Sequence, residues 1–188
     1  MRLLTNQKES NSGYYNNISR ILRLFETFYW RIIYKGYHKK YDIDPTFRFN
    51  GPNIEVFGEG SIRFGKNSYI GRNSIIQCSK DCSIIIGDNC SISHYLKIYT
   101  ANYSSEDIIS EKNEIRLRKG NVKIGDNCWI GLNVFIREGI NIGNNCVIGA
   151  HSVVVHDVPN NTLIAGNPAR IIKKYDKKKD KIEYFNTV

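Results

Sequence analysis

The chain repeats an aliphatic residue with a period of six. From residue 124 onward the period is unbroken, and a second small or apolar residue follows each aliphatic one four positions later. The first set is Ile124, Ile130, Ile136, Ile142, Ile148 and Val154, and the second is Cys128, Val134, Ile140, Cys146, Ser152 and Val158. A helix repeats near 3.6 residues and a half-buried strand at 2, whereas hexapeptide units are typical of a β-solenoid in which each unit forms a short strand and a corner. Three units complete one triangular coil, so we expect residues about 18 apart to stack.

Gly and Asn recur between the repeated aliphatic positions. Ile-Gly-Asp-Asn occupies 86–89 and 124–127, and Ile-Gly-Asn-Asn occupies 142–145. These residue types adopt positive φ at the lowest cost, so the motifs predict the corners. The period extends upstream in two phases separated by a slip of two residues around 78–83: Phe64, Ile70 and Ile76, then Ile86, Ile92 and Ile98.

The repeat is interrupted once. Ile98 and Ile124 are 26 residues apart, which we interpret as one coil plus about eight extra residues, so a loop is expected within 102–121. Polar loops on rigid scaffolds often carry function. A tolerated insertion is the alternative.

Charge divides the chain into three parts. Residues 1–50 hold nine Lys/Arg against four Asp/Glu, 170–188 hold seven against three, and 51–169 hold eleven of each, so the whole net charge of +9 lies in the two ends. We predict a helical arm (1–50), one solenoid domain (51–169) and a short basic C-terminal tail (170–188). The ends suit an anionic partner such as a phosphorylated cofactor, an anionic lipid surface or an acidic glycan, and the neutral scaffold disfavours nucleic acid.

The arm carries an amphipathic helix. Apolar residues follow helical spacing from Ile18 to Ile33, after a capping Asn16 or Asn17 and before Gly36. Such a helix is expected to cap the open first coil, and a basic, aromatic-rich helix also suits a membrane surface. With no signal peptide or membrane span in the sequence, we expect a cytoplasmic protein, with the inner face of the membrane as the surface that such a helix would contact.

The cysteines favour a structural role over a metal site. Cys90, Cys128 and Cys146 fall at inward positions and are expected to be buried and reduced. Cys78 and Cys82 lie at the phase slip, and no His stands at a useful spacing from them. No metal is therefore expected.

The C-terminal repeats resemble the hexapeptide-repeat acyltransferases. The segment 158–173 reads Val-Pro-Asn-Asn-Thr-Leu-Ile-Ala-Gly-Asn-Pro-Ala-Arg-Ile-Ile-Lys and follows Ile-Gly-Ala-His-Ser-Val-Val at 148–154. With Val-Lys-Ile-Gly-Asp-Asn-Cys-Trp-Ile-Gly at 122–131 and Ile-Tyr-Thr-Ala-Asn at 98–102, the resemblance covers about residues 52–174. It implies a left-handed parallel β-helix, a homotrimer, and acetyl-CoA bound in grooves between subunits. The likeness is to enzymes of the maltose, galactoside and surface-polysaccharide O-acetyltransferase type.

The resemblance also implies the cofactor residues. It suggests Trp129 near the catalytic centre and backbone groups at Gly131, Gly149 and Ala150 beside the bound molecule. A turn and its basic residues are implied at the nucleotide end, namely Gly166, Asn167, Pro168, Arg170 and Lys173. Cationic side chains there would offset the phosphates of CoA. The chain departs from the family at Val155-His156, where relatives often have Thr-Lys.

The catalytic residue is the main departure. Where the maltose-type enzymes have a His after the Ile-Tyr-Thr-Ala segment, this chain has Tyr103, which we expect to lie above or below Trp129. A tyrosine with its ordinary pKa near 10 is a poor base at neutral pH. His94, in a Ser-His pair just before that segment, is therefore the predicted general base, with Tyr103 as the second candidate and a solvated corner residue as the alternative for His94.

The predicted reaction is direct acetyl transfer from acetyl-CoA to a sugar hydroxyl, or to an amine, of a bacterial surface polysaccharide or its precursor. The oxyanion would be stabilised by a backbone N–H on the rung from Trp129 to Gly131. Alternative acceptors are a small free sugar or an antibiotic. Two other classes stay open. One is a solenoid that binds acetyl-CoA without turnover. The other is a metal enzyme of the γ-carbonic anhydrase type, because the spacing of His151 and His156 resembles that of its zinc ligands, although their position within the six-residue repeat does not.

Overall fold

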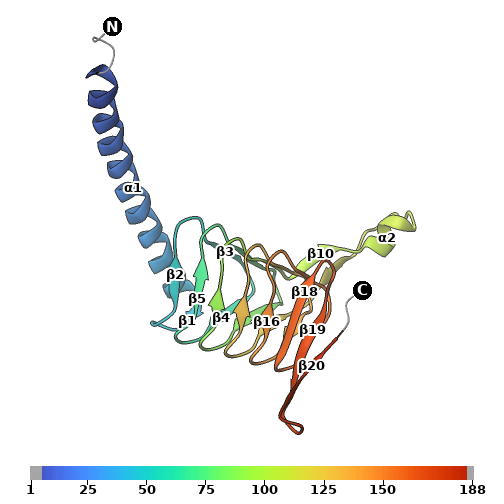
Figure 1. Cartoon of the computed structure of the whole chain (residues 1–188). Coiled ribbons are helices and arrows are strands. Elements are labelled where there is room, and N and C mark those ends of the chain that lie inside the picture. Colours follow the sequence, from blue (N-terminus) through green and yellow to red (C-terminus); the bar gives the residue numbers. More distant parts are fainter. Residues whose placement is uncertain (1–5, 186–188) are drawn as a thin grey trace.

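The computed structural model describes residues 6–185, with side chains from residue 17 onward, and shows a parallel β-solenoid with one long helix at its first coil (Figure 1). Residues 1–5 and 186–188, at the ends of the predicted arm and tail, lie outside the described part. The helix α1 spans Asn6–Lys40. The chain then winds through three sheets, here named A, B and C, so that each coil contributes one strand to each sheet.

Sheet A contains β1 (Asp42–Ile43), β4 (Ser61–Phe64), β7 (Ser83–Ile86), β12 (Val122–Ile124) and β15 (Asn141–Ile142). Sheet B contains β2 (Arg48–Asn50), β5 (Tyr69–Gly71), β8 (Ser91–Ile92), β13 (Trp129–Ile130), β16 (Val147–Ile148), β18 (Thr162–Gly166), β19 (Ala169–Asp176) and β20 (Lys181–Tyr184). Sheet C contains β3 (Glu55–Gly58), β6 (Ile75–Cys78), β9 (Lys97–Tyr99), β14 (Phe135–Ile136) and β17 (Val153–Val154). Between sheets C and A the chain leaves the solenoid as β10 (Ala101–Tyr103), α2 (Ser105–Ile109) and β11 (Leu117–Lys119).

The core confirms the six-residue period. All twelve repeated positions from Ile124 to Val158 are buried, and Cys128 and Cys146 stack 18 residues apart as predicted. Inward aliphatic side chains of successive coils form one continuous column, which provides the hydrophobic stabilisation that a single flat coil could not. The five cysteines are buried and free, and burial raises the pKa of Cys78 to about 11.

In the corner motifs the Asn and Gly residues have different roles. The Asn residues hold positive φ, as at Asn89 (55°), Asn127 (56°) and Asn145 (55°). Gly125 does not. A Cβ on it would lie 2.8 Å from the carbonyl carbon of Gly143 in the next coil, so the glycine is required by the close approach of backbone. The positive φ predicted for this glycine was therefore wrong.

The interruption is larger than predicted. Ile98 pairs with Ile136, 38 residues later, and Gly120 N donates to Thr100 O (3.0 Å) where the chain rejoins the solenoid. Ile98 lies in sheet C and Ile124 in sheet A, so these two residues are one strand apart and not one coil apart. The excursion, residues 101–119, therefore accounts for about 20 extra residues, and the prediction of eight was wrong because it matched strands of different sheets.

The helix α1 is longer than predicted and continues through Gly36 to Lys40. Its last turns pack on the first coil, where Tyr34 stacks on Phe49 with ring centroids 4.5 Å apart. The Tyr34 hydroxyl donates to Gly51 O (2.6 Å), and burial raises its pKa to about 12. The rest of the helix projects away from the solenoid (Figure 1).

The ends of the solenoid also differ from the predicted boundaries. The first coil begins at β1, which pairs with β4 before residue 51 is reached. The predicted tail forms an antiparallel hairpin, because β19 pairs with β18 and β20 pairs with β19. The strand edge that a last coil would expose is thus covered by the chain's own next strands.

Replacing Gly125 by Ala should destabilise the protein by about 1–3 kcal/mol, because the added methyl collides with backbone of the next coil. Gly36→Ala is the matched control, since nothing lies within 4 Å of a Cβ there and alanine favours a helix. Thermal and urea unfolding should show a loss only for Gly125→Ala. Equal effects of the two substitutions would contradict the close-approach argument.

Candidate functional site

His94 lies at the edge of the solenoid where the chain turns from sheet B to sheet C. Its backbone oxygen accepts a hydrogen bond from Asn133 N (2.9 Å), and in the next coil Leu132 O accepts one from His151 N (2.7 Å). These bonds place His94 and Leu132 in one column along the edge. Ala150 and then Gly166 continue the column, since Gly149 N donates to Ile164 O and the strands keep their register. We call this column the B–C edge.

The imidazole of His94 fits into the space left by a glycine. A Cβ on Gly71 would lie 2.3 Å from His94 Nδ1, so only glycine permits this side-chain position. Nδ1 is buried and makes no hydrogen bond to any described residue. Nε2 is not enclosed and is the nitrogen available to a bound molecule.

Backbone amides flank His94 along the B–C edge, but not those first expected. The N–H groups of Trp129 and Gly131 donate within the solenoid to Cys146 O (2.9 Å) and Ile148 O (2.8 Å). These two amides are therefore already satisfied, because in a parallel ladder alternate amides point into the neighbouring strand. Within the described part of the chain the amide of Ala150 has no partner, and it lies 2.6 Å from where a Cβ of Gly131 would stand. The absence of a side chain at Gly131 thus leaves this donor uncovered.

The basic residues of the C-terminal motif lie further along. Gly166 has φ of 107°, and a cis peptide joins Asn167 to Pro168. Arg170 is exposed and, with His156, lines a cavity of about 280 Å³. The substitution of His156 for the family's basic residue therefore still leaves an imidazole beside Arg170.

The Lys173 side chain makes a contact within the terminal hairpin. Its ammonium group lies over the ring of Tyr184, 4.9 Å from the centroid, within the terminal hairpin. A cation–π contact of this kind holds the side chain against β20. Arg170, the other basic residue predicted for the nucleotide end, has no such contact with a described ring, and its Nη1 donates to Ala169 O (3.1 Å).

Tyr103 lies on the excursion and not beside Trp129. Tyr103 pairs with Leu117, while Trp129 stacks between Ser91 and Val147 in sheet B. The prediction that the two aromatic residues lie one above the other was wrong. It counted residues between strands of different sheets, as did the prediction that underestimated the length of the excursion. Both side chains are exposed, Tyr103 by 70% and Trp129 by 60%.

A buried carboxylate that the repeat pattern did not reveal organises the excursion. Asp107 is fully buried and its two oxygens accept from Arg116 Nε and Nη2 (2.7 Å each), and one also accepts from Lys112 Nζ (2.8 Å). These hydrogen bonds, led by those of Arg116, hold the pKa of Asp107 well below its ordinary value. Ser104 caps α2 by accepting from Asp107 N (3.3 Å). The Ser-x-x-Asp spacing was the signal available in the sequence.

The excursion is also tied to sheet C. Asn102 Nδ2 donates to Glu138 Oε2 (2.6 Å), and the carboxylate of Glu138, nearly buried, lies 3.8 Å from Arg118 Nε and 3.6 Å from Arg137 Nε. Within residues 6–185 no group of three His, Cys, Asp or Glu side chains could hold a metal ion. No described helix is long and apolar enough to cross a membrane.

Comparison with known proteins identifies the family. The repeat described as the hexapeptide repeat of succinyl-transferase matches residues 61–93 and 121–155. WbbJ of Escherichia coli K12, named as a lipopolysaccharide biosynthesis O-acetyl transferase, is 38% identical over 133 residues, which are 67% of each chain. The chain therefore belongs to the hexapeptide-repeat acetyltransferases, and the predicted enzyme class is confirmed.

Solved structures agree. A maltose O-acetyltransferase from Clostridium difficile is 38% identical with a TM-score of 0.54, covering 70% of this chain and 72% of that one. A hexapeptide-repeat acetyltransferase from Vibrio cholerae, solved in complex with acetyl-CoA, is 30% identical with a TM-score of 0.53 and the same coverage. Both cover the solenoid fold predicted from the period of six.

The order of the excursion should depend on pH through Asp107. Because its folded-state pKa is depressed, the carboxylate stabilises the excursion above its ordinary pKa of 3.8, and this stabilisation is lost as pH falls through and below that value. Protection of residues 101–119 against hydrogen exchange, taken relative to the intrinsic exchange rate at each pH, should therefore fall progressively below about pH 4. Asp107→Asn should show the reduced protection already at pH 7. Unchanged protection of the excursion in that variant would contradict this role.

Proposed function

We propose that the protein transfers the acetyl group of acetyl-CoA to a sugar hydroxyl, or to an amine, of a bacterial surface polysaccharide or its precursor. The observation that carries the proposal is the B–C edge, where the open Nε2 of His94 and the uncovered amide of Ala150 lie along one side; Arg170 of β19 pairs with Ala165, next to the last residue of this column, Gly166. The names of the relatives, including an acetyl-CoA complex, support the donor and the reaction.

In the proposed reaction His94 Nε2 accepts the proton of the acceptor hydroxyl as its oxygen attacks the thioester carbonyl. The N–H of Ala150 stabilises the oxyanion, and collapse of the tetrahedral intermediate breaks the C–S bond. The departing CoA thiolate takes the proton back from His94. For Nε2 to act as a base it must carry a lone pair, so the proton of the neutral imidazole lies on Nδ1. No described residue accepts a hydrogen bond from Nδ1, so the base lacks the carboxylate partner that would strengthen it.

Arg170 and His156 are proposed to bind the phosphates of CoA. A guanidinium binds phosphate through two parallel hydrogen bonds, and the cavity that these two residues line is open to solvent on the side of the last coil. Gly131, Gly149 and Ala150 would lie against the pantetheine arm. Gly166, Asn167 and Pro168 form the turn that holds Arg170 in place. Trp129, which is exposed on sheet B, is proposed to lie beside the donor, and Lys173 to lie near it from its position over the Tyr184 ring.

The excursion supplies the argument for a homotrimer. Four apolar side chains on it are exposed: Ile108, Ile109, Ile115 and Leu117. Apolar surface of this kind on an ordered segment favours a protein contact, and a second copy would also bring Tyr103 towards a neighbouring B–C edge.

Light scattering should give three times the 21.7 kDa of the chain, and Ile109→Asp should lower that mass. A monomer at assay concentrations would count against the shared site.

Membrane contact through α1 stays a prediction. The exposed apolar residues of the helix lie on the side opposite Tyr34 and Tyr37, which pack on the first coil. They are Ile18, Ile21, Leu22, Phe25, Phe28, Tyr29 and Ile32. This arrangement supports a role at the inner face of the membrane, which co-sedimentation with anionic vesicles tests directly.

Kinetics of two variants discriminate the candidate bases. His94→Ala should lower kcat by about 10², the lower end of the range for a positioned base, because no described residue supports Nδ1. Tyr103→Phe should cost much less, since it removes only a hydroxyl that orients the acceptor. Acetyl transfer is measured by release of free CoA thiol. An active His94→Ala enzyme beside an inactive Tyr103→Phe enzyme would reverse the assignment.

Acetyl-CoA binding separates loss of chemistry from loss of the donor. Calorimetric titration should give the same affinity for wild-type protein and His94→Ala, because the donor is bound by the later coils. Arg170→Ala should weaken binding. No heat with acetyl-CoA at millimolar concentration would overturn the proposed function, whereas binding without turnover would favour the non-catalytic solenoid.

A further inference from the structure

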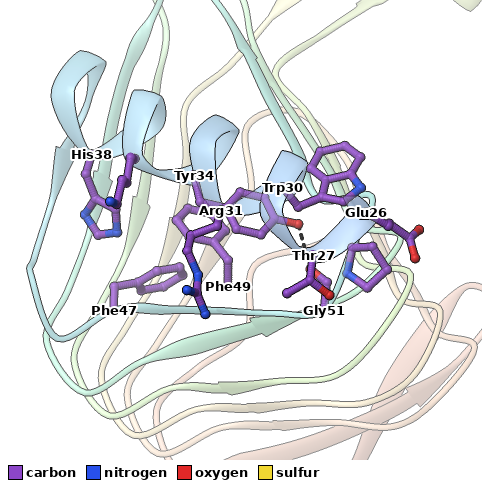
Figure 2. Close-up of a pocket in the computed structure, with 11 residues that line it drawn as sticks. Glu26, Thr27, Trp30, Arg31, Tyr34, His38, Phe47, Phe49 and Gly51 are labelled. Atoms are coloured by element: carbon purple, nitrogen blue, oxygen red, sulfur yellow. Dashed lines mark hydrogen bonds between the residues drawn. The ribbon is translucent and has the colours of Figure 1, made fainter. Parts of the chain in front are cut away.

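A pocket of about 380 Å³ lies between α1 and the first coil (Figure 2). Aromatic rings of Trp30, Tyr34, Phe47 and Phe49 form much of its wall. The wall is rigid, since Phe47 is buried in the core and Tyr34 is fixed by its stacking and by its hydrogen bond to Gly51 O. The pocket is therefore formed before any ligand arrives.

The charges that line the pocket are mostly positive. Arg31, Lys35 and His38 extend from successive turns of α1, and Glu26 is the one acidic lining residue among those described. Neither Arg31 nor Lys35 makes an ion pair or hydrogen bond with a described residue, so both are free to bind an anion. Figure 2 shows Arg31 and His38 towards Phe47, with Glu26 beside Trp30 at the other end.

The pocket opens onto the same edge as His94. Gly51, a lining residue, stacks on Arg72, since a Cβ on Gly51 would lie 2.9 Å from Arg72 Cβ. Arg72 O in turn accepts from Tyr95 N (3.0 Å), which places His94 directly above Arg72. Two coil steps thus separate Gly51, at one end of the pocket, from His94, which is about 10 Å at the spacing of paired strands.

Arg72 stands between the two sites. Its side chain is exposed and makes no ion pair or hydrogen bond with a described residue. Arg72 thus places one positive charge between the pocket and His94, and the end of the pocket nearest Gly51 also carries Glu26 (Figure 2). Two linked pyranose rings span such a distance.

We propose that the pocket between α1 and the first coil is a second acceptor subsite, which binds an acidic sugar of an oligosaccharide about two units away from the sugar that is acetylated. The rings of Trp30 and Phe49 contact the apolar face of the sugar. Arg31 and Lys35 bind its carboxylate or phosphate, and Glu26 and Thr27 accept from its hydroxyl groups, since the Thr27 hydroxyl itself donates to Arg23 O (2.7 Å). The inference rests on the proposed function, because it takes His94 as the reacting end, and it narrows the acceptor to an anionic glycan.

Binding can be read without any acetyl transfer. The chain has two tryptophans, so Trp129→Phe leaves Trp30 as the sole indole, inside the pocket. Its fluorescence is titrated with tetragalacturonate, with a phosphorylated maltotetraose and with neutral maltotetraose; the first two distinguish carboxylate from phosphate. We expect a saturable change with at least one acidic tetramer, with affinity about tenfold above that for the neutral one.

Matched variants localise the response. Arg31→Ala/Lys35→Ala in the Trp129→Phe background should weaken acidic-tetramer binding about tenfold, as expected for the loss of charge-assisted hydrogen bonds at an exposed site. Arg20→Ala/Arg23→Ala, on the same helix outside the pocket, should leave it unchanged. Equal response to the neutral tetramer, equal response in both double variants, or no response of Trp30 to either acidic tetramer, as when a second copy of the chain covers the pocket, would overturn the proposal.

Kinetics with an acidic oligosaccharide acceptor give the second readout. Arg72→Gln and Arg31→Ala/Lys35→Ala should raise the KM for the acceptor about tenfold and leave the KM for acetyl-CoA unchanged. Acceptor KM values equal to wild type would also overturn the subsite. Binding in the pocket with no turnover in the wild-type protein would instead refute acetyl transfer while leaving the subsite intact.

Discussion

The hydrogen-bonded spacing of successive coils is the constraint on which the rest of the structure depends. Strands of neighbouring coils lie about 4.8 Å apart, so anything that stands between two coils must be thinner than a side chain. This is why Gly125 meets the backbone of Gly143 closely, while Asn127, two residues later, takes the positive φ. Burial of the inward isoleucines provides the hydrophobic free energy of folding, and the corners permit the coils to approach closely enough to bury these side chains.

The same spacing builds the proposed catalytic edge. At Gly71 the missing Cβ makes room for an imidazole, and at Gly131 it leaves an amide uncovered. The proposed catalytic groups, an imidazole and a backbone amide, are therefore accessible at positions where a coil has glycine and so lacks a side chain. The excursion follows a different rule, since it is held by the charged contacts of Asp107 and not by stacking.

The sequence predicted whatever obeys the period, including the solenoid, its buried positions and the stacking of Cys128 on Cys146. It failed where the period stops. Ile98 and Ile124 belong to different sheets, and nothing in their spacing reveals that, so the excursion was underestimated and Tyr103 was placed beside Trp129. The terminal hairpin was missed because an antiparallel return carries no six-residue signal. His94 could be singled out from the Ser-His pair, but its fit against Gly71 needs the register of β5 and β8.

The long helix shows a further limit of pattern reading. Its apolar stripe was visible from Ile18 to Ile33, yet the residues that attach it to the solenoid are the tyrosines beyond that stripe, Tyr34 and Tyr37. The pocket beneath α1 arises from this attachment and from Phe49 of the first coil. Contacts between residues so close in sequence but in different elements are set by the geometry of the turn at Tyr41, which no periodicity encodes.

A solenoid edge measures length in discrete steps. The subsite beneath α1 and His94 are separated by a whole number of coils, and that number can change only by gain or loss of a complete coil, because a partial one would misalign every inward side chain above it. A homologue with one more coil between the two points would hold its reacting atom about 4.8 Å further from the anchoring sugar. Repeat number could in this way set which unit of a glycan chain is modified, with no change in the residues that carry out the reaction.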